Sequence, residues 1–121
     1  GDLILLYGDL GCGKTQFTKG IASGMDISEV VTSPTFMIER IYESPESNKG
    51  NRLILHHFDL YRTNNDRDIL DEIQDLLQDK SNIVVVEWPE NMKALIGLAH
   101  ISVHFNYVSE NERQITIGEK L

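Results

Sequence analysis

One run of eight residues near the amino terminus constrains the fold more than any other part of the sequence: Gly8, Asp9, Leu10, Gly11, Cys12, Gly13, Lys14 and Thr15. It fits the pattern G-x-x-x-x-G-K-S/T, whose glycines let backbone N–H groups curl around phosphate oxygens. Such a loop joins a strand to a helix. The continuous apolar run Leu3–Tyr7 precedes it, and apolar residues recur every four positions after it. The sequence therefore predicts a buried strand, a phosphate-binding loop and a helix over Lys14–Ser23.

The last two residues of this run predict how a nucleotide is held. In proteins with such a loop, the lysine reaches the β- and γ-phosphates and the next hydroxyl binds magnesium. Lys14 and Thr15 stand at these positions. The helix that begins at Lys14 also presents the positive end of its dipole to the phosphates. Binding of phosphate and magnesium is thus the first functional expectation.

Glu87 is the candidate carboxylate for the same ion. It follows the apolar run Ile83–Val86, which predicts a central strand that Pro89 ends. If this strand lies parallel to Leu3–Tyr7, Glu87 comes to the carboxyl end of the sheet, beside the loop. Magnesium is usually bound by one or two carboxylates together with phosphate oxygens. The alternative is an ordinary solvated glutamate at the end of a strand.

Asp59 is a second candidate carboxylate. It lies in a further expected strand, Leu53–Tyr61, where a charged group among apolar residues needs a partner. Either the magnesium site or a salt bridge to Arg62 or a nearby lysine would provide one. The sequence leaves both alternatives open.

Thr35 and Trp88 are candidates because of their positions. Thr35 closes the segment Thr32–Thr35, between the first helix and an expected strand over Thr35–Tyr42. A loop that senses the γ-phosphate would lie there, and the alternative is a hydroxyl-rich turn. Trp88 follows Glu87 directly, and its alternative is a place in the core or at an interface.

The four histidines do not predict a metal site. His56 and His57 are adjacent, so their side chains point to opposite faces of a strand. His100 and His104 can share one face, but the sequence offers no third ligand near them. We expect all four to be packing or surface residues.

The rest of the chain completes an α/β pattern. A helix is expected after the N-cap Asp66, an exposed loop over Ser44–Asn51, and an antiparallel hairpin over Ile101–Ile117. These elements predict a three-layer fold like that of P-loop NTPases, with a mixed central sheet and an antiparallel edge hairpin. Its parallel centre should include Leu3–Tyr7 and Ile83–Trp88. Residues 1–121 are expected to form one domain.

Composition narrows the possible functions. The chain has 121 residues, 40% of them hydrophobic, and a formal net charge of −8. Such a charge argues against a broad basic face for nucleic acid. No apolar run approaches the length of a membrane span or a signal sequence, and the single cysteine, Cys12, cannot form an internal disulfide. We expect a soluble, cytoplasmic protein.

Four segments taken together resemble one family. The runs GDLGCGKT, TSPTF, HHFDLYR and VEWPE, in this order and spacing, are similar to the TsaE (YjeE) family, bacterial ATPases of tRNA threonylcarbamoyladenosine synthesis. The resemblance covers nearly the whole chain and is specific because it combines four motifs. It implies ATP and Mg²⁺ as cofactors. It also implies that such a protein acts with TsaB and TsaD and reaches tRNA only through them.

The resemblance also implies roles for individual residues. Lys14, Asp59, Glu87 and Thr35 would be catalytic, and Thr15, Glu87 and Asp59 would hold the metal. The nucleotide would contact the loop from Gly8 to Thr15 together with Gln16, Trp88 and Arg113. Slow hydrolysis of ATP is implied, which would support threonylcarbamoyl transfer without performing it.

This chain departs from the family pattern in three places. Cys12 stands where alanine is usual, and Gln16 replaces a common threonine. Family members also carry a helix and a strand before the loop's strand, and this chain, beginning at Gly1, is expected to lack them. Two other functions remain as alternatives: a P-loop small-molecule kinase, and a non-catalytic module whose partner binding depends on nucleotide. The kinase would need an arginine-bearing lid, and Ser44–Asn51 contains no arginine.

Overall fold

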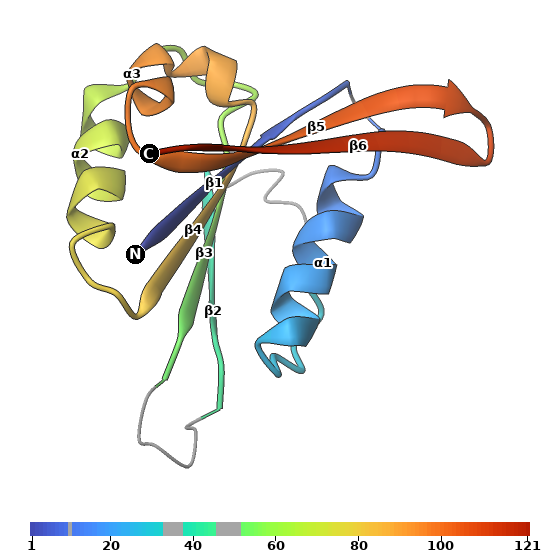
Figure 1. The fold of residues 1–121 in the computed structure, drawn as a ribbon. Coiled ribbons are helices and arrows are strands. Elements are labelled where there is room, and N and C mark those ends of the chain that lie inside the picture. The colour runs from blue at the N-terminus through green and yellow to red at the C-terminus, as the bar shows by residue number, and fades with distance from the viewer. Residues whose placement is uncertain (10, 33–37, 46–51) are drawn as a thin grey trace.

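A computed structural model describes residues 1–9, 11–32, 38–45 and 52–121 (Figure 1). Six strands form one mixed sheet in the order β2-β3-β4-β1-β5-β6. The strands are β1 Asp2–Tyr7, β2 Glu39–Glu43, β3 Ile54–Asp59, β4 Asn82–Glu87, β5 His100–Ser109 and β6 Glu112–Lys120. The helices are α1 Lys14–Gly24, α2 Arg67–Leu76 and α3 Lys93–Ile96, with a short 3-10 helix, η1, over Pro89–Asn91.

The centre of the sheet is parallel, as the apolar runs predict. β1 lies between β4 and β5 and runs parallel to both, and β3 runs parallel to β4. β2 and β6 pair antiparallel at the two edges, with β3 and β5 respectively. The expected edge hairpin is therefore confirmed. The strands β3, β4 and β1 all end at the same edge of the sheet, where residues far apart in sequence meet.

Helices cover both faces of the sheet and give the expected three layers. Figure 1 shows α1 on one side, and α2 and α3 on the other. The apolar residues of β1, β3 and β4 alternate between two buried clusters, as the pleat requires. Leu6, Leu55 and Val85 face α1, whereas Leu5, Phe58 and Val86 belong to the cluster under α2 and α3.

The buried stripe of α1 differs from the expected one. Its buried residues are Lys14, Thr18 and Ala22, four positions apart. The apolar residues that recur at the same spacing flank this stripe and are only partly buried, as Phe17 is against Phe105 at 5.6 Å between ring centroids. Because Lys14 lies on the stripe, helix packing itself turns this lysine inward.

Element boundaries agree within a few residues, with two additions. β3 is shorter than the expected Leu53–Tyr61, and β2 begins at Glu39 within the described residues. The sequence did not predict η1 or α3, both of which follow Trp88. The expected start of β2, Thr35, and most of the loop Ser44–Asn51 lie outside the described residues. In the part of the chain that the structure describes, no helix has the length and apolar character needed to cross a membrane.

A polar network ties edge strand β2 to the sheet centre and to α2. His56 Nδ1 lies 2.9 Å from Glu39 Oε2, and His56 Nε2 lies 3.1 Å from Asn82 Oδ1. Asn82 in turn donates to the carbonyl of Leu76 at 3.0 Å. A hydrogen bond with Glu39 raises the pKa of the Glu72 carboxyl from 4.5 to about 7, with burial and the charge of Glu39 adding to the rise. One proton is therefore shared between β2 and α2.

This network predicts pH-dependent stability. Because the pKa of Glu72 is higher in the folded than in the unfolded protein, its contribution is full below pH 4.5 and is lost as pH rises through about 7. Glu72→Gln keeps the donor to Glu39 at every pH. We expect this variant to resist urea better than wild type at about pH 8.5 and to differ little at about pH 4. An equal effect at both pH values would contradict the shared proton.

Candidate functional site

The loop between β1 and α1 has the backbone shape of a phosphate site. Gly8, Gly11 and Gly13 have φ values of 152°, 75° and 106°, in the region that favours glycine. Gly13 is the N-cap of α1 and has no side chain to cap it. The N–H groups of the first turn of α1, a helix of 11 residues, are thus left for an external acceptor such as a phosphate.

The first glycine of the loop is also enclosed. A Cβ atom at Gly8 would lie 2.7 Å from Cys12 Sγ and 3.0 Å from Phe105 Cβ. Cys12 is buried and belongs to the cluster under α1. The cysteine at this position therefore packs the underside of the loop against the sheet, as a small apolar residue would.

Lys14 is held inside the loop. Its side chain is 5% exposed, and Nζ donates to the carbonyl of Gly8 at 2.7 Å. The same ammonium lies 3.9 Å from the centre of the Trp88 ring, a cation–π contact. A buried lysine is costly unless it has partners, and here both partners lie beside the loop. The ammonium of Lys14 is thus fixed between the glycine loop and the Trp88 ring.

Trp88 adopts a strained backbone conformation next to Glu87. Its φ and ψ are 59° and 49°, a left-handed conformation that is uncommon for a bulky residue. Its indole packs on Tyr61, with 5.0 Å between ring centroids, and on the apolar cluster under α2. The left-handed turn leads the chain from β4 into η1 and places the ring over Lys14. Such strain is typical of functional sites.

Glu87 ends β4 at the carboxyl edge, as expected. Its register partners are Leu6 on β1 and Asp59 on β3, so it lies between the strand that enters the loop and the second candidate carboxylate. The side chain is buried, and Oε2 lies 2.6 Å from Nε2 of His57. The sequence predicts no role for His57, because it does not reveal how β3 and β4 are aligned or that the histidine reaches Glu87, two residues beyond its register partner Val85.

Asp59 lies beside Glu87 at the end of β3. It is partly buried, and Oδ1 accepts a hydrogen bond from the backbone N–H of Tyr61 at 3.0 Å. This bond closes a turn directly after the strand and holds the carboxylate at the edge of the sheet. Asp59 and Glu87 are therefore adjacent, as the resemblance to the family implies.

A third acidic residue, Glu90 on η1, adds to the electrostatics around Lys14. Burial raises the pKa of its carboxyl, and the ammonium of Lys14 opposes the rise. Burial, followed by the charge of Glu90, raises the pKa of the Tyr7 hydroxyl. Tyr7 also stacks on His104, with 4.5 Å between ring centroids. The carboxyl end of β1 is thus surrounded by ionisable groups.

The residues at this edge suit magnesium better than a metal held by protein alone. Among the described residues, no group of three His, Cys, Asp or Glu side chains is arranged to hold a metal ion. Thr15 and Glu87 offer one hydroxyl and one carboxylate, both hard oxygen ligands. Magnesium typically takes one or two such ligands and completes its shell with phosphate oxygens and water. The donor set fits this ion.

For the other predicted site residues, the structure gives fewer contacts or none. Asp9 and Gln16 are exposed and Thr15 is partly buried, whereas Leu10 and Thr35 lie outside the described residues. Arg113 stands at the turn end of the β5–β6 hairpin, which projects past α1 (Figure 1). Its Nη1 donates to the carbonyl of Ser109 at 2.6 Å, and its guanidinium covers Tyr107.

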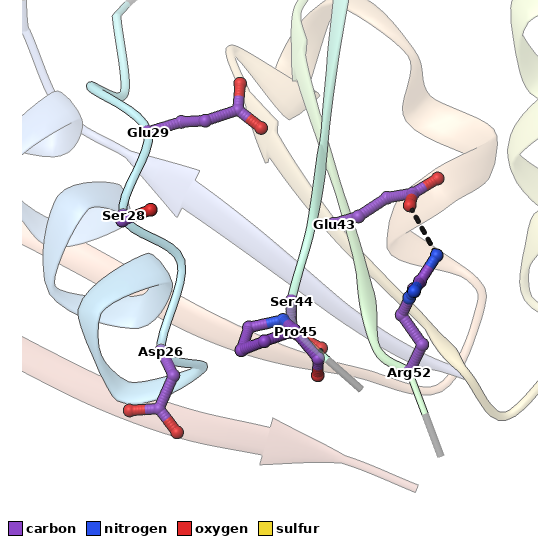
Figure 2. A pocket seen from close by; sticks show the side chains of 7 residues that line it. All are labelled: Asp26, Ser28, Glu29, Glu43, Ser44, Pro45 and Arg52. Atoms are coloured by element: carbon purple, nitrogen blue, oxygen red, sulfur yellow. Dashed lines mark hydrogen bonds and ion pairs between the residues drawn. The ribbon is translucent and has the colours of Figure 1, made fainter. Parts of the chain in front are cut away.

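A separate pocket, drawn in Figure 2, lies where β2 ends and β3 begins, at the end of the sheet opposite the glycine loop. It has a volume of about 410 Å³ and is lined by Asp26, Ser28, Glu29, Glu43, Ser44, Pro45 and Arg52. Its one arginine already pairs with Glu43 at 3.2 Å. The other two charges are carboxylates, which would repel phosphate. This pocket therefore does not compete with the glycine loop as a nucleotide site.

The sheet order and the helices on both faces define an α/β protein with a P-loop NTPase-like fold. The family model described as "Threonylcarbamoyl adenosine biosynthesis protein TsaE" matches residues 1–115, and the chain belongs to this family.

Similar proteins agree with this assignment. The TsaE protein of Bacillus subtilis, named for tRNA threonylcarbamoyladenosine biosynthesis, is 37% identical over 120 residues, which cover 96% of this chain and 68% of the relative. The corresponding protein of Mycobacterium tuberculosis H37Rv is 35% identical and is covered to 70%, with 95% of this chain. The crystal structure of B. subtilis YdiB matches with a TM-score of 0.70 and 32% identity, covering 97% of this chain and 67% of that one.

The packing of Gly8 yields a stability prediction. Gly8→Ala adds a Cβ at a positive φ and against Cys12 Sγ, so we expect it to lower the free energy of unfolding by about 1–3 kcal/mol. Gly20→Ala is the matched control, because its Cβ meets nothing within 4 Å on exposed α1 surface. That variant should be more stable than wild type by about 0.5–1 kcal/mol. Urea denaturation of both would measure the contrast, and equal effects would contradict it.

Proposed function

We propose that this protein binds and slowly hydrolyses ATP, and that it supports threonylcarbamoyl transfer to the anticodon-loop adenosine of tRNA without performing the transfer. The observation that carries the proposal is the convergence at one edge of the sheet: Lys14 beside a glycine loop, with Trp88 over it, and Glu87 at the end of the neighbouring strand β4. Membership of the TsaE family supports a role in threonylcarbamoyladenosine biosynthesis.

In the proposed mechanism the chain positions the γ-phosphate and balances its charge. The loop N–H groups and Lys14 bind the phosphate oxygens, as in other P-loop proteins. Thr15 and Glu87 would hold Mg²⁺, which when bound neutralises charge on the β- and γ-phosphates. Asp59 or Glu87 orients the attacking water, since their carboxylates are neighbours in register. Trp88, whose ring lies over the Lys14 ammonium, would contact the nucleotide.

The proposed partners are TsaB- and TsaD-like proteins. A protein with a net charge of −8 is unsuited to binding the tRNA polyanion directly, so tRNA would be bound by the partner complex. This division of labour places the protein in the cytoplasm, where tRNA is modified. A small-molecule kinase and a non-catalytic nucleotide-dependent module are the alternatives to be tested.

The first test concerns the loop. Lys14→Ala removes a charge-assisted contact with phosphate worth about 1.5–3 kcal/mol, so calorimetry should show a roughly ten-fold or larger loss of affinity for ATP. Lys19→Ala is the control, because Lys19 is an exposed lysine of the same helix. If both variants bound ATP as wild type does, the assignment of the loop would be wrong.

The second test concerns the pathway. Turnover of ATP should rise when matched TsaB and TsaD are added, and it should stay at background with Lys14→Ala. A non-catalytic module would instead bind the partners equally well with ATP and with a non-hydrolysable analogue, and would show no turnover. A kinase would form a phosphorylated small molecule, which mass spectrometry of the reaction would detect.

A further inference from the structure

His57 is more deeply buried than the two charged residues of the site, Lys14 and Glu87. It is 0% exposed, and it lies on the face of β3 that α1 covers, next to the apolar Leu55 and Val85. A leucine or valine would fill such a place at lower cost, because an imidazole must satisfy two nitrogens. The presence of a histidine here therefore needs an explanation beyond packing.

The hydrogen bond to Glu87 determines the state of the ring. A carboxylate can only accept, so the proton between Oε2 and Nε2, 2.6 Å apart, belongs to His57. Nδ1, the other ring nitrogen, is the single buried side-chain nitrogen or oxygen without a hydrogen-bond partner among the described residues. Leaving such an atom unpaired costs about 1–3 kcal/mol. The protein accepts this cost and keeps the bond to Glu87.

The register shows what that bond achieves. His57 and Asp59 are two residues apart on one face of β3, and Asp59 is the register partner of Glu87. His57 thus approaches Glu87 from the core side, whereas the loop and Asp59 lie at the edge. With Oε2 held by the ring, Oε1 is the carboxylate oxygen that remains for a ligand.

We propose that His57 is a positioning residue for the magnesium carboxylate. Its Nε2–H holds Oε2 of Glu87 and fixes the side-chain rotamer, so that Oε1 faces the ion bound at the loop. Partners of this kind orient metal ligands, and their loss usually costs 10- to 100-fold in metal affinity. The inference rests on the proposed function, because it requires that Mg²⁺ and a nucleotide bind at this edge.

The test measures magnesium affinity directly. A non-hydrolysable ATP analogue is bound to the protein, Mg²⁺ is titrated in, and the fluorescence of Trp88, the only tryptophan, reports binding, with calorimetry as a second readout. His57→Leu removes the donor, and we expect the Mg²⁺ midpoint to rise about ten-fold or more. His57→Gln places an amide N–H where Nε2 lies and should bring the midpoint back to within about three-fold of wild type.

The control is His56→Leu. His56 is the neighbouring buried histidine, but it faces away from the site and bonds to Glu39 and Asn82. Its loss should lower the melting temperature and leave the Mg²⁺ midpoint unchanged. This separates a positioning role from a general effect of removing a buried histidine.

The outcomes distinguish the inference from the function on which it rests. An unchanged midpoint in His57→Leu, or a failure of His57→Gln to recover it, overturns the positioning role while the nucleotide site stands. If wild type shows no Mg²⁺-dependent binding of the analogue, the proposed function itself fails. Should His57→Leu not fold, His57→Asn takes its place, because its shorter amide does not reach Oε2 and should fail where His57→Gln succeeds.

Discussion

The parallel pairing of β4 with β1 is the constraint on which the candidate site depends. Because the two strands run in the same direction, both end at one edge, and Leu6 and Glu87 come into register there. The glycine loop continues β1, and the strained turn at Trp88 continues β4. A loop and a carboxylate separated by some seventy positions in sequence thereby become neighbours. An antiparallel arrangement of the same strands would place them at opposite ends of the sheet.

Several destabilising features lie together at this edge of the sheet. A lysine and a glutamate are buried, a tryptophan is left-handed, and a histidine nitrogen lacks a partner among the described residues. The strained backbone and the unpaired nitrogen each cost on the order of 1–3 kcal/mol, and a buried charge costs several kcal/mol unless it is paired. The compensation comes from apolar residues that alternate onto the two faces of β1 and β4, most of which are buried. The packed centre of the sheet thus stabilises the fold, whereas the residues at this edge destabilise it, as is typical of functional sites.

Sequence patterns predicted the features that depend on residue type and spacing within one segment. The loop from Gly8, the apolar strands and the N-cap Asp66 all follow from residue type and spacing, and the structure confirms the parallel centre and the edge hairpin. Contacts between strands were harder to predict, because register is a property of two segments together. The bond between His57 and Glu87 depends on it. The four-residue helix α3 is too short to hold by its own propensity, so only its packing through Leu95 explains it.

The adjacent histidines His56 and His57 show how one strand contributes to stability on one face and to the candidate site on the other. The pleat sends His56 to the α2 side, where it joins Glu39 and Asn82 in a network that ties β2 to the sheet. It sends His57 to the α1 side, where the partner is Glu87. The same residue type thus stabilises the edge of the sheet on one face and orients a site carboxylate on the other. A shift of β3 by one residue would exchange the two, which makes the register of β3 against β4 as important to the site as the glycine loop.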